Sequence, residues 1–420
     1  MDRDTPMMFR GLVFAALLLI QGESRATPQT EMAGFAEKLI IYLAKGPANS
    51  CGPGCDRWIA VEGKVDQAAA VRVSRFLRGV KDLTRPIYFH SPGGVVEPAY
   101  VIGRLLRSRK AVARVGRTIV AGCGEGMQVD NACLKVKTSG GEVEGEISTF
   151  HAMCNSACSY LFLGATKREV APDAVLGVHN SKLTLVVHGR PPPQLLADFR
   201  GRSKAKADQE RRSFIAAMGI SHDLDDLIRT VKFENMHVLT RPELYRFGID
   251  TRSIADTAWT LETAARPYVR KIALANIDNG ESFRTMEWWL FCENKSRARL
   301  MFIREFGKDA AGVRSVIVMA GSEKPVDFGT FPARTGTYEA WSGTVSSDAM
   351  QAVLAVPRLQ MGEATLLPDG QAKQEIFDVD TSGLEPAWTK LRASCPAAPN
   401  PAAPAGPRAA TVAPGSAPAP

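Results

Sequence analysis

Short apolar runs alternate with longer segments of helical periodicity in the first third of the chain, and this alternation constrains the fold most. Residues 58–61, 87–90 and 112–120 are predicted strands. The segments 68–80 and 95–106 between them place apolar side chains at the spacing of one helical face. Strand, helix, strand, helix, strand is the order of parallel β-α-β units, so we expect an α/β domain.

An uncharged run from Cys158 to Ala165 follows further along the chain, directly after Ser156. It is too short to span a membrane and too apolar for a surface helix, so it predicts a buried helix with Ser156 at its N-terminus. A helix N-terminus favours developing negative charge. The predicted strand 174–178 then ends at His179. Ser156 and His179 are therefore a candidate nucleophile and base, although serine is also a preferred N-cap, and that structural interpretation stays open.

A third element precedes these two. The predicted strand 87–90 is followed by Ser91-Pro92-Gly93-Gly94, a turn before a helix. Glycines at such a junction let the backbone approach a ligand and direct N–H groups at it. A Gly-Gly turn, a buried helix headed by serine and a strand ending in histidine, in this order, form a specific set for nucleophilic catalysis.

On these motifs, residues 57–252 resemble the Clp protease proteolytic subunit, within the wider ClpP/crotonase superfamily. The resemblance implies a ClpP/crotonase-like β-α-β core. The matching blocks are WIAVEGKVD at 58–66, IYFHSPGG at 87–94, SACSYLFL at 156–163, GVH at 177–179 and LTRPELYRFGID at 239–250.

The resemblance also implies roles for four residues. Ser156 would be the nucleophile and His179 the base, and the backbone N–H groups of Gly94 and Ala157 would form the oxyanion hole. This chain also differs from the family, because residues 120–149 form an insertion that we expect to be a hairpin.

The third member of the family's catalytic triad is an aspartate, and its position falls near Met236, where this chain has no aspartate. Glu234 and Asn235 lie within a small shift of that position. Either side chain could orient the imidazole, as a third group does in other triads.

The N-terminus carries a targeting signal. Arg10 precedes the apolar residues 11–20, and Ser24-Arg25-Ala26 provides small residues for cleavage. This pattern predicts a secretory signal peptide cut after Ala26, and an uncleaved anchor is the alternative. We expect a periplasmic or secreted protein. The family's ATP-driven unfoldase partners are not expected there.

Eight cysteines in an exported chain favour disulfides. Crossed pairs that involve Cys123 or Cys133 stay open, as does strain in a bridge across the start of the buried helix. No cofactor is expected, and no metal site, because the cysteines and histidines lack ligand spacing. The simplest pairing is Cys51/Cys55, Cys123/Cys133, Cys154/Cys158 and Cys292/Cys395.

Beyond residue 257, short apolar strands separated by Gly, Pro and Asp turns predict a smaller antiparallel β domain, a sandwich. The N-terminal segment includes apolar residues 32–43, which are expected to be partly helical. The expected domains are a signal peptide at 1–26, an N-terminal segment at 27–56, the ClpP-like α/β domain at 57–256, the β-rich domain at 257–395 and a disordered Pro/Ala-rich tail at 396–420.

The sequence thus predicts an exported serine hydrolase, a peptidase with a peptide or protein substrate. A catalytically inactive ClpP-like binding or scaffolding protein is the main alternative, and an acyl-CoA enzyme of the crotonase type is a third. A Ser–Lys dyad through Lys182, Lys204 or Lys206 is also open. The net charge of +8 is spread along the chain, so no nucleic-acid partner is expected. Homo-oligomer formation stays open.

Overall fold

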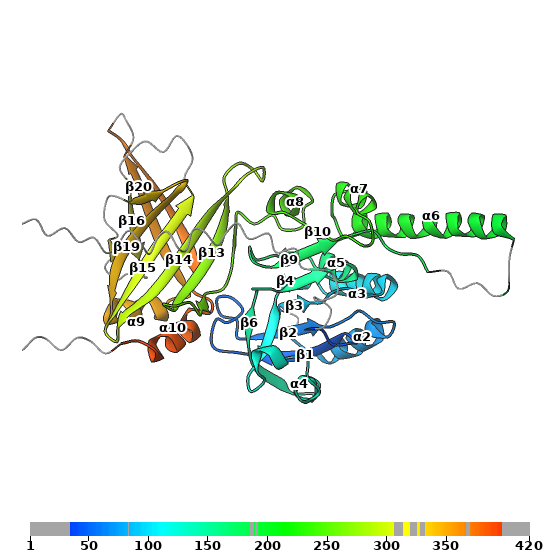
Figure 1. Cartoon of the computed structure of the whole chain (residues 1–420), viewed down its shortest axis with the longest axis horizontal. Helices are drawn as coiled ribbons and strands as arrows, with labels where there is room; N and C mark the ends of the chain where they lie inside the picture. The colour runs from blue at the N-terminus through cyan, green and yellow to red at the C-terminus, as the bar shows by residue number, and fades with distance from the viewer. Residues whose placement is uncertain are drawn as a thin grey trace, which may run out of the picture.

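The computed structural model describes residues 34–82, 84–184, 189, 192–305, 314–319, 326–327, 332–366 and 370–396. Within these residues an α/β core is followed by a smaller antiparallel β domain (Figure 1). The fold class expected from the sequence is therefore confirmed. The predicted signal peptide lies outside the described residues, as does nearly all of the Pro/Ala-rich tail.

The central sheet of the core runs through the described residues in the order β5-β6-β1-β2-β3-β4-β8. Strands β2, β3, β4 and β8 are mutually parallel, whereas β1 pairs antiparallel with β2. The bounds are β1 Ile40–Lys45, β2 Arg57–Glu62, β3 Ile87–His90, β4 Val112–Val115, β5 Arg117–Val120, β6 Glu142–Ser148 and β8 Lys167–Glu169.

A smaller sheet with the order β10-β9-β7 carries the candidate site. Its strands are β7 Met153–Asn155, β9 Val175–Val178 and β10 His237–Val238. The helices of the core are α2 Ala69–Gly79, α3 Val96–Ser108, the 3-10 helix η3 Glu125–Met127, α4 Asn131–Lys137, α5 Ala157–Leu163, α6 Pro193–Ala217, α7 Asp223–Thr230 and α8 Arg241–Arg246.

Both faces of β2 are buried, because side chains alternate across a strand. Ile59 and Val61 belong to the main hydrophobic core with α2, α3 and α5. Trp58 and Ala60 face a second cluster on the other side of the sheet, which the insertion helps to cover through Cys133. The core sheet is therefore covered by conventional crossover helices on one face and by inserted segments on the other.

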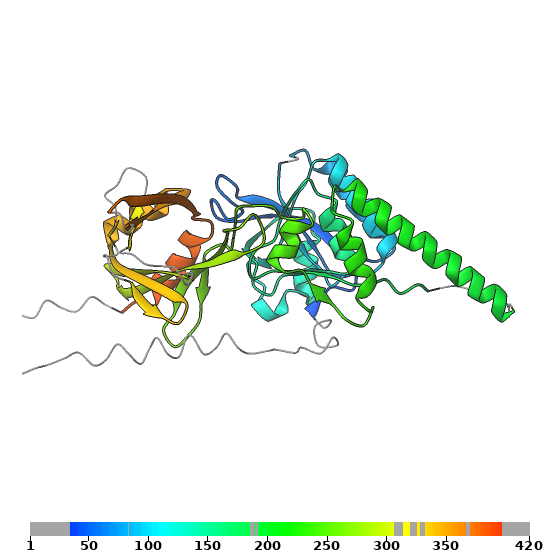
Figure 2. The same cartoon turned by 90° about the horizontal axis from the view of Figure 1, so that it is seen from above.

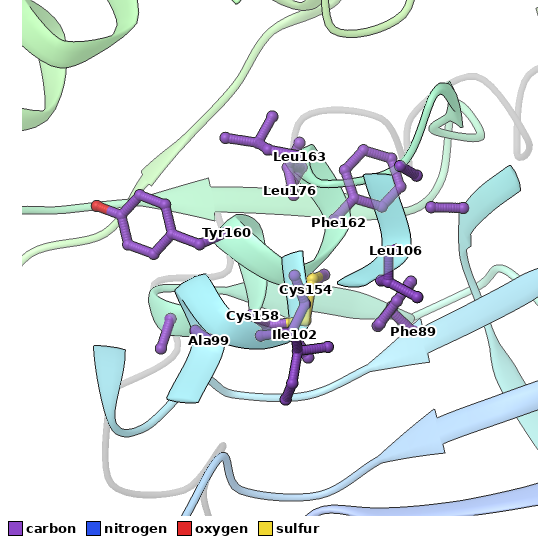
Figure 3. Close-up of a cluster of buried hydrophobic side chains, with 14 of the residues drawn as sticks. Phe89, Ala99, Ile102, Leu106, Cys154, Cys158, Tyr160, Phe162, Leu163 and Leu176 are labelled. Atoms are coloured by element: carbon purple, nitrogen blue, oxygen red, sulfur yellow. A yellow bond between two sulfur atoms is a disulfide. The ribbon is translucent and has the colours of Figure 1, made fainter. Parts of the chain in front are cut away.

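The expected buried helix is α5, in which all seven residues are buried. Helix α5 packs mainly against α3. Figure 3 shows buried side chains of the two helices, such as Ile102 of α3 and Phe162 of α5. A Cβ on Gly103 of α3 would lie 2.7 Å from the carbonyl oxygen of Tyr160, so only glycine allows this approach. An uncharged sequence is required here, because an unpaired charge in such a core would be costly.

Three local expectations need correction. Residues 40–45 form strand β1 rather than a helix, because Ile40, Ile41 and Tyr42 favour a strand and pair with β2. The expected strand 112–120 is divided at Gly116, which packs against the ring of Tyr88. The inserted hairpin is present as the antiparallel pair β5–β6, but η3 and α4 join its arms, and β6 also pairs with β1.

The C-terminal domain contains two antiparallel sheets with one shared core, as a sandwich requires. Trp288 and Phe302 from one sheet meet Met361 from the other. The described strands are β11 Ile254–Asp256, β12 Thr260–Glu262, β13 Tyr268–Asn276, β14 Phe283–Asn294, β15 Arg297–Glu305, β16 Arg314–Met319, β17 Val326–Asp327, β18 Ala333–Thr335, β19 Tyr338–Ser346, β20 Arg358–Leu366 and β21 Ala372–Asp380. Two helices accompany them, α9 Ser347–Ala355 and α10 Leu384–Ala393.

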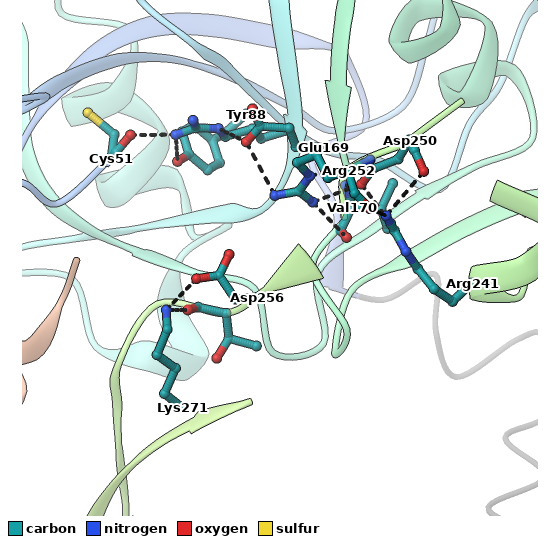
Figure 4. Close-up of polar contacts among 11 residues, drawn as sticks. Cys51, Tyr88, Glu169, Val170, Arg241, Asp250, Arg252, Asp256 and Lys271 are labelled. Carbon is teal, nitrogen blue, oxygen red and sulfur yellow. Dashed lines mark hydrogen bonds and ion pairs between the residues drawn. The ribbon is translucent and has the colours of Figure 1, made fainter. Parts of the chain in front are cut away.

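A buried ion network lies where the α/β core leads into the β domain (Figure 4). The Asp250 carboxylate accepts hydrogen bonds from Arg241 at 2.7 Å and Arg252 at 2.8 Å, and Arg252 also donates to the carbonyl of Val170. Burial alone would raise the pKa of Asp250, but the two guanidinium groups hold it well below its usual range. The carboxylate therefore stays charged and paired.

All eight cysteines lie in the described residues, and their pairing matches the simplest assignment from the sequence. Cys292–Cys395 joins β14 to the segment after α10. The Cα atoms of Cys154 and Cys158 are 5.1 Å apart, within the usual range for a disulfide. The domain bounds at residues 56 and 256 stay predictions. Strand β1 comes from the predicted N-terminal segment, and it belongs to the core sheet.

The long helix α6 projects from the core in both views (Figure 2). It carries many charged residues, including Lys204, Lys206 and Arg212. Among the described helices, none combines the length and apolar character needed to cross a membrane.

The insertion contributes a buried ion pair to the core, and it provides a stability test. The Glu62 carboxylate accepts from Lys137 Nζ at 2.7 Å, from the Tyr42 hydroxyl at 3.0 Å and from the Thr118 N–H at 2.9 Å. Lys137→Met leaves a buried carboxylate without its cation, so we expect the free energy of unfolding in urea to fall by about 3–5 kcal/mol.

The matched control is Lys45→Met, which breaks the exposed pair with Glu144. Its effect should stay within about 1 kcal/mol, because exposed pairs contribute little. Equal losses for the two variants would contradict a structural role for the buried pair.

Candidate active site

Ser156 lies at a sharp turn between strand β7 and the buried helix α5. Its backbone has φ 56° and ψ −122°, a conformation that residues other than glycine rarely adopt. Its side chain makes no capping hydrogen bond to α5. The hydroxyl of Ser156 therefore does not act as a helix N-cap. Strained turns of this kind are often found at functional sites.

The hydroxyl of Ser156 instead meets His179, with 2.7 Å between Oγ and Nε2. Strand β9 holds the histidine in place through the carbonyl of Gly177, two residues earlier. This carbonyl accepts from the N–H of Ser156 at 2.9 Å and from the hydroxyl of Ser159 at 2.7 Å. The turn and the end of β9 are thus joined directly, which fixes the pair that the sequence placed far apart.

The other ring nitrogen of His179 determines its tautomer. Nδ1 lies 2.6 Å from the carbonyl oxygen of Phe233, and a carbonyl can only accept. Nδ1 must therefore carry the proton in the neutral ring. Nε2 is left with a free lone pair facing the Ser156 hydroxyl, which is the state required of a general base.

The segment that provides this carbonyl is anchored at both ends to the region of β9. The N–H of Asn180 donates to the carbonyl of Val231, and the N–H of Leu239 donates to that of Leu176. The Phe233 ring also stacks on the imidazole, with 5.0 Å between centroids and 30° between planes. Both contacts restrict rotation of the His179 ring.

The predicted third members do not lie on Nδ1. The carbonyl of Phe233 occupies that position, instead of the side chain of Glu234 or Asn235. Met236, where the family's aspartate was expected, packs against Gly177. The correction has a simple cause: the loop is held by its backbone, so a main-chain oxygen reaches the ring. Glu234 acts on His179 only through its charge.

Burial lowers the pKa of His179 below its ordinary value of 6.5. The hydrogen bond to Phe233 and the charge of Glu234 act in the opposite direction and raise it. Because the lowering dominates, the imidazole is neutral at neutral pH. It can therefore accept a proton from Ser156 without first losing one.

The Ser-Pro-Gly-Gly turn packs directly against Ser156. Gly93 and Gly94 have φ of 99° and 144°, and a Cβ on Gly93 would lie 2.6 Å from that of Ser156. A Cβ on Gly94 would collide with the carbonyl of Val65. Within the described residues, the N–H groups of Gly94 and Ala157 donate to no backbone carbonyl outside their own elements. Their role as an oxyanion hole, which the resemblance implies, stays a prediction.

His90 supports this arrangement from the end of β3. Its Nδ1 accepts from the N–H of Met153 at 3.2 Å, and its ring packs on Phe35. The N–H of Ser91 donates to the carbonyl of Met153, and that of Asn155 donates to Ser91. The Gly-Gly turn and the strand before Ser156 are therefore held side by side.

His179 is partly buried, and its neighbour Asn180 borders a hollow. A hollow of about 430 Å³ is lined by polar and charged side chains of α6 and α7. Phe233 and Met236 are exposed apolar residues on the adjacent loop. Lys204 lines the hollow, and Nζ of Lys182 lies 5.9 Å from the centroid of the Phe233 ring. The hydroxyl of Ser156 is contacted by His179 and not by either lysine.

Two contributors to the site were not found from the sequence. Phe233 contacts His179 through its backbone carbonyl, and no sequence pattern predicts which residue's carbonyl lies beside the ring. His90 was assigned to a strand, and only its position before the Gly-Gly turn could have singled it out. In the part of the chain that the structure describes, no cluster of His, Cys, Asp or Glu is arranged to hold a metal ion.

No family model and no curated protein matches this chain. Among solved structures, it is similar to the 1510-N membrane-bound stomatin-specific protease in a mutant form, at 15% identity and a TM-score of 0.27, over 44% of this chain and 73% of that one. It is also similar to invasion associated protein b from Bartonella henselae, at 9% identity and a TM-score of 0.26, over 32% of this chain and 92% of that one. Similarity at this level does not establish a family or a function.

The contact of His90 with Met153 predicts a pH-dependent stability. Burial lowers the pKa of His90 from 6.5 to about 4; the charge of Glu62 opposes this, and those of Arg117 and Lys137 add to it. The neutral ring stabilises the fold above pH 6.5, and this contribution is lost as pH falls toward about 4. Between about pH 7.5 and pH 5, we expect a loss of about 1–2 kcal/mol from this group.

Urea unfolding at the two pH values measures this loss. His90→Asn keeps an acceptor near the Met153 N–H but does not titrate, so its stability should change less with pH than that of the wild type. His151→Asn alters an exposed histidine and should keep the wild-type pH dependence. An unchanged pH dependence in His90→Asn would show that other groups cause the acid sensitivity.

Proposed function

We propose that the protein is an exported serine hydrolase of the ClpP type, a peptidase that acts through an acyl-enzyme on Ser156. The observation that carries this proposal is the 2.7 Å contact between Ser156 Oγ and the unprotonated Nε2 of His179, at a strained turn beside two available N–H groups. The sequence resemblance of residues 57–252 to the Clp protease proteolytic subunit supports the same reaction.

In the proposed reaction, Ser156 Oγ attacks the carbonyl carbon of the substrate while Nε2 of His179 takes the hydroxyl proton. The carbonyl oxygen becomes negative and accepts from the N–H groups of Gly94 and Ala157. His179 then gives its proton to the leaving amine as the C–N bond breaks. Water then attacks the acyl-enzyme while the same imidazole takes a proton from it. The imidazolium returns this proton to Ser156 Oγ as the ester bond breaks and the acid is released.

A peptide substrate fits the surroundings of the site. Phe233, Met236 and Val238 are exposed apolar side chains beside the end of β9. The hollow next to Asn180 offers charged groups of both signs. Apolar contacts with a few fixed polar groups are the usual composition of a binding site for a flexible chain.

Export is part of the proposal. The predicted signal peptide supports it, and so do the four disulfides, since disulfides persist in oxidising compartments. In that setting no ATP-driven unfoldase is expected, so the substrate would reach Ser156 without active unfolding.

A catalytically inactive ClpP-like scaffold is the second candidate, and one observation favours it. Nδ1 of His179 meets a neutral carbonyl instead of a carboxylate. A carboxylate stabilises the imidazolium that forms during catalysis, and removing it from a triad greatly slows the reaction. An active-site probe distinguishes the two candidates.

A fluorophosphonate should label Ser156 in the wild-type protein, because the probe reacts only with an activated hydroxyl. Ser156→Ala should abolish labelling but lower the free energy of unfolding by only about 1 kcal/mol, since its hydroxyl caps no helix. His179→Ala should slow labelling by about 10²–10⁴-fold through loss of the base. Mass spectrometry of digested protein identifies the labelled residue.

Ser181→Ala and His151→Ala are matched controls, because both residues are exposed and contact neither member of the pair. Each should keep wild-type labelling. A folded wild-type protein that resists the probe would reject the hydrolase and leave the scaffold as the function.

The pH dependence of labelling tests the role of Glu234. Labelling should fall as pH drops through the pKa of His179, because the base works only when neutral. The charge of Glu234 raises that pKa, so Glu234→Gln should move the acid limb of the profile to lower pH. Asn235→Ala should leave the profile unchanged. Loss of all labelling in Glu234→Gln would instead indicate direct contact between that carboxylate and the ring.

A further inference from the structure

A disulfide brackets Ser156. Cys154 lies two residues before it on β7, and Cys158 lies two residues after it in the first turn of α5. The sulfur–sulfur bond therefore closes a short ring of chain whose central residue is the proposed nucleophile. Figure 3 shows this bond at the centre of the hydrophobic core, next to Ile102.

Both cysteines are completely buried. Their Cα atoms are held 5.1 Å apart, although one belongs to a strand and the other to a helix. A strand of five residues would separate its ends by more than twice that distance. The chain between them must therefore fold back sharply, and the residue at the bend is Ser156, with its φ of 56°.

Hydrogen bonds also hold this turn. The N–H of Ser156 donates to Gly177 and that of Asn155 donates to Ser91, but both bonds lie before the bend or at it. The side chain of Ser156 makes no capping bond to α5. After the bend, the hydroxyl of Ser159 donates to the carbonyl of Gly177 on β9. The covalent link through Cys158 ties the first turn of α5 directly to β7.

We infer that the Cys154–Cys158 disulfide is a positioning device for the nucleophile: it holds Ser156 in its positive-φ conformation, with Oγ on His179 and the Ala157 N–H free for the oxyanion. This inference rests on the proposed hydrolase function. Without the bridge, Ser156 can relax toward an ordinary helical or extended backbone. Its hydroxyl then leaves the imidazole, while the substrate surface stays in place.

The bridge also makes activity depend on oxidation. It forms by thiol–disulfide exchange with a disulfide donor: the two thiols lose two protons and two electrons, the sulfur–sulfur bond forms, and the donor is released as a dithiol. Once folded, the bond is buried away from thiol reductants. The chain would thus acquire its active turn on folding in an oxidising compartment and keep it afterwards.

The test compares Cys154→Ala/Cys158→Ala with Cys51→Ala/Cys55→Ala in otherwise intact protein. Both remove a bridge of sequence separation 4, with Cα distances of 5.1 Å and 5.0 Å, so the chain-entropy contributions to stability should be alike. Cys51 and Cys55 belong to the cluster on the opposite face of the sheet. Labelling of Ser156 by a fluorophosphonate is measured over a range of probe concentrations, below the melting temperature of each variant.

We expect removal of the Cys154–Cys158 bridge to lower the saturating labelling rate about 100-fold, because small misplacements of a nucleophile cost this much. The half-saturating probe concentration should stay at the wild-type value, since the binding surface is unchanged. The Cys51–Cys55 variant should match the wild type in both quantities. A general loss of structure would not separate the two quantities in this way.

Wild-type labelling in the Cys154–Cys158 variant would overturn the inference and leave the hydrolase intact. A wild-type protein without labelling would instead reject the hydrolase itself. If the Ala pair fails to fold, Cys154→Val/Cys158→Ala restores part of the lost core volume and is measured in its place. If neither variant folds, the bridge stabilises the whole core, and the positioning role is rejected.

Discussion

The backbone of Ser156 is the constraint on which the site depends. A strand must end and a buried helix must begin within one residue, at a φ of 56°. A helix that begins inside the core has to be uncharged, which explains the composition of Ala157–Leu163. The turn also needs a neighbour without a side chain, and Gly93 supplies it. The positive-φ conformation of Ser156 thus accounts for the uncharged sequence of α5 and for the glycine at position 93.

The pairing of His179 with a backbone carbonyl separates two tasks that a triad aspartate combines. Phe233 orients the ring and fixes the proton on Nδ1. It contributes only a dipole to an imidazolium, whereas a carboxylate would contribute a full charge. Glu234 supplies its charge from a greater distance. The arrangement preserves geometry and tautomer, and it gives up part of the electrostatic stabilisation of the charged ring.

The sequence predicted the elements whose composition leaves few choices. Cys158–Ala165 could only be a buried helix, and the Gly-Gly turn, Ser156 and His179 appear in one order. It could not predict the acceptor on Nδ1, because a carbonyl belongs to every residue and only the path of the loop selects Phe233. It also missed β1, because the strand-favouring residues 40–42 stand at the end of the longer apolar run 32–43, and only the pairing with β2 separates them from it.

The insertion is connected to the site by electrostatics as well as by packing. Lys137 from α4 neutralises Glu62 on β2, and Glu62 is paired in register with His90 on β3. Burial lowers the pKa of His90, the charge of Glu62 raises it, and the charge of Lys137 lowers it further. A protonated His90 could no longer accept from the N–H of Met153. The inserted helix therefore helps to keep His90 neutral, and the neutral ring holds the strand before Ser156 against the Gly-Gly turn.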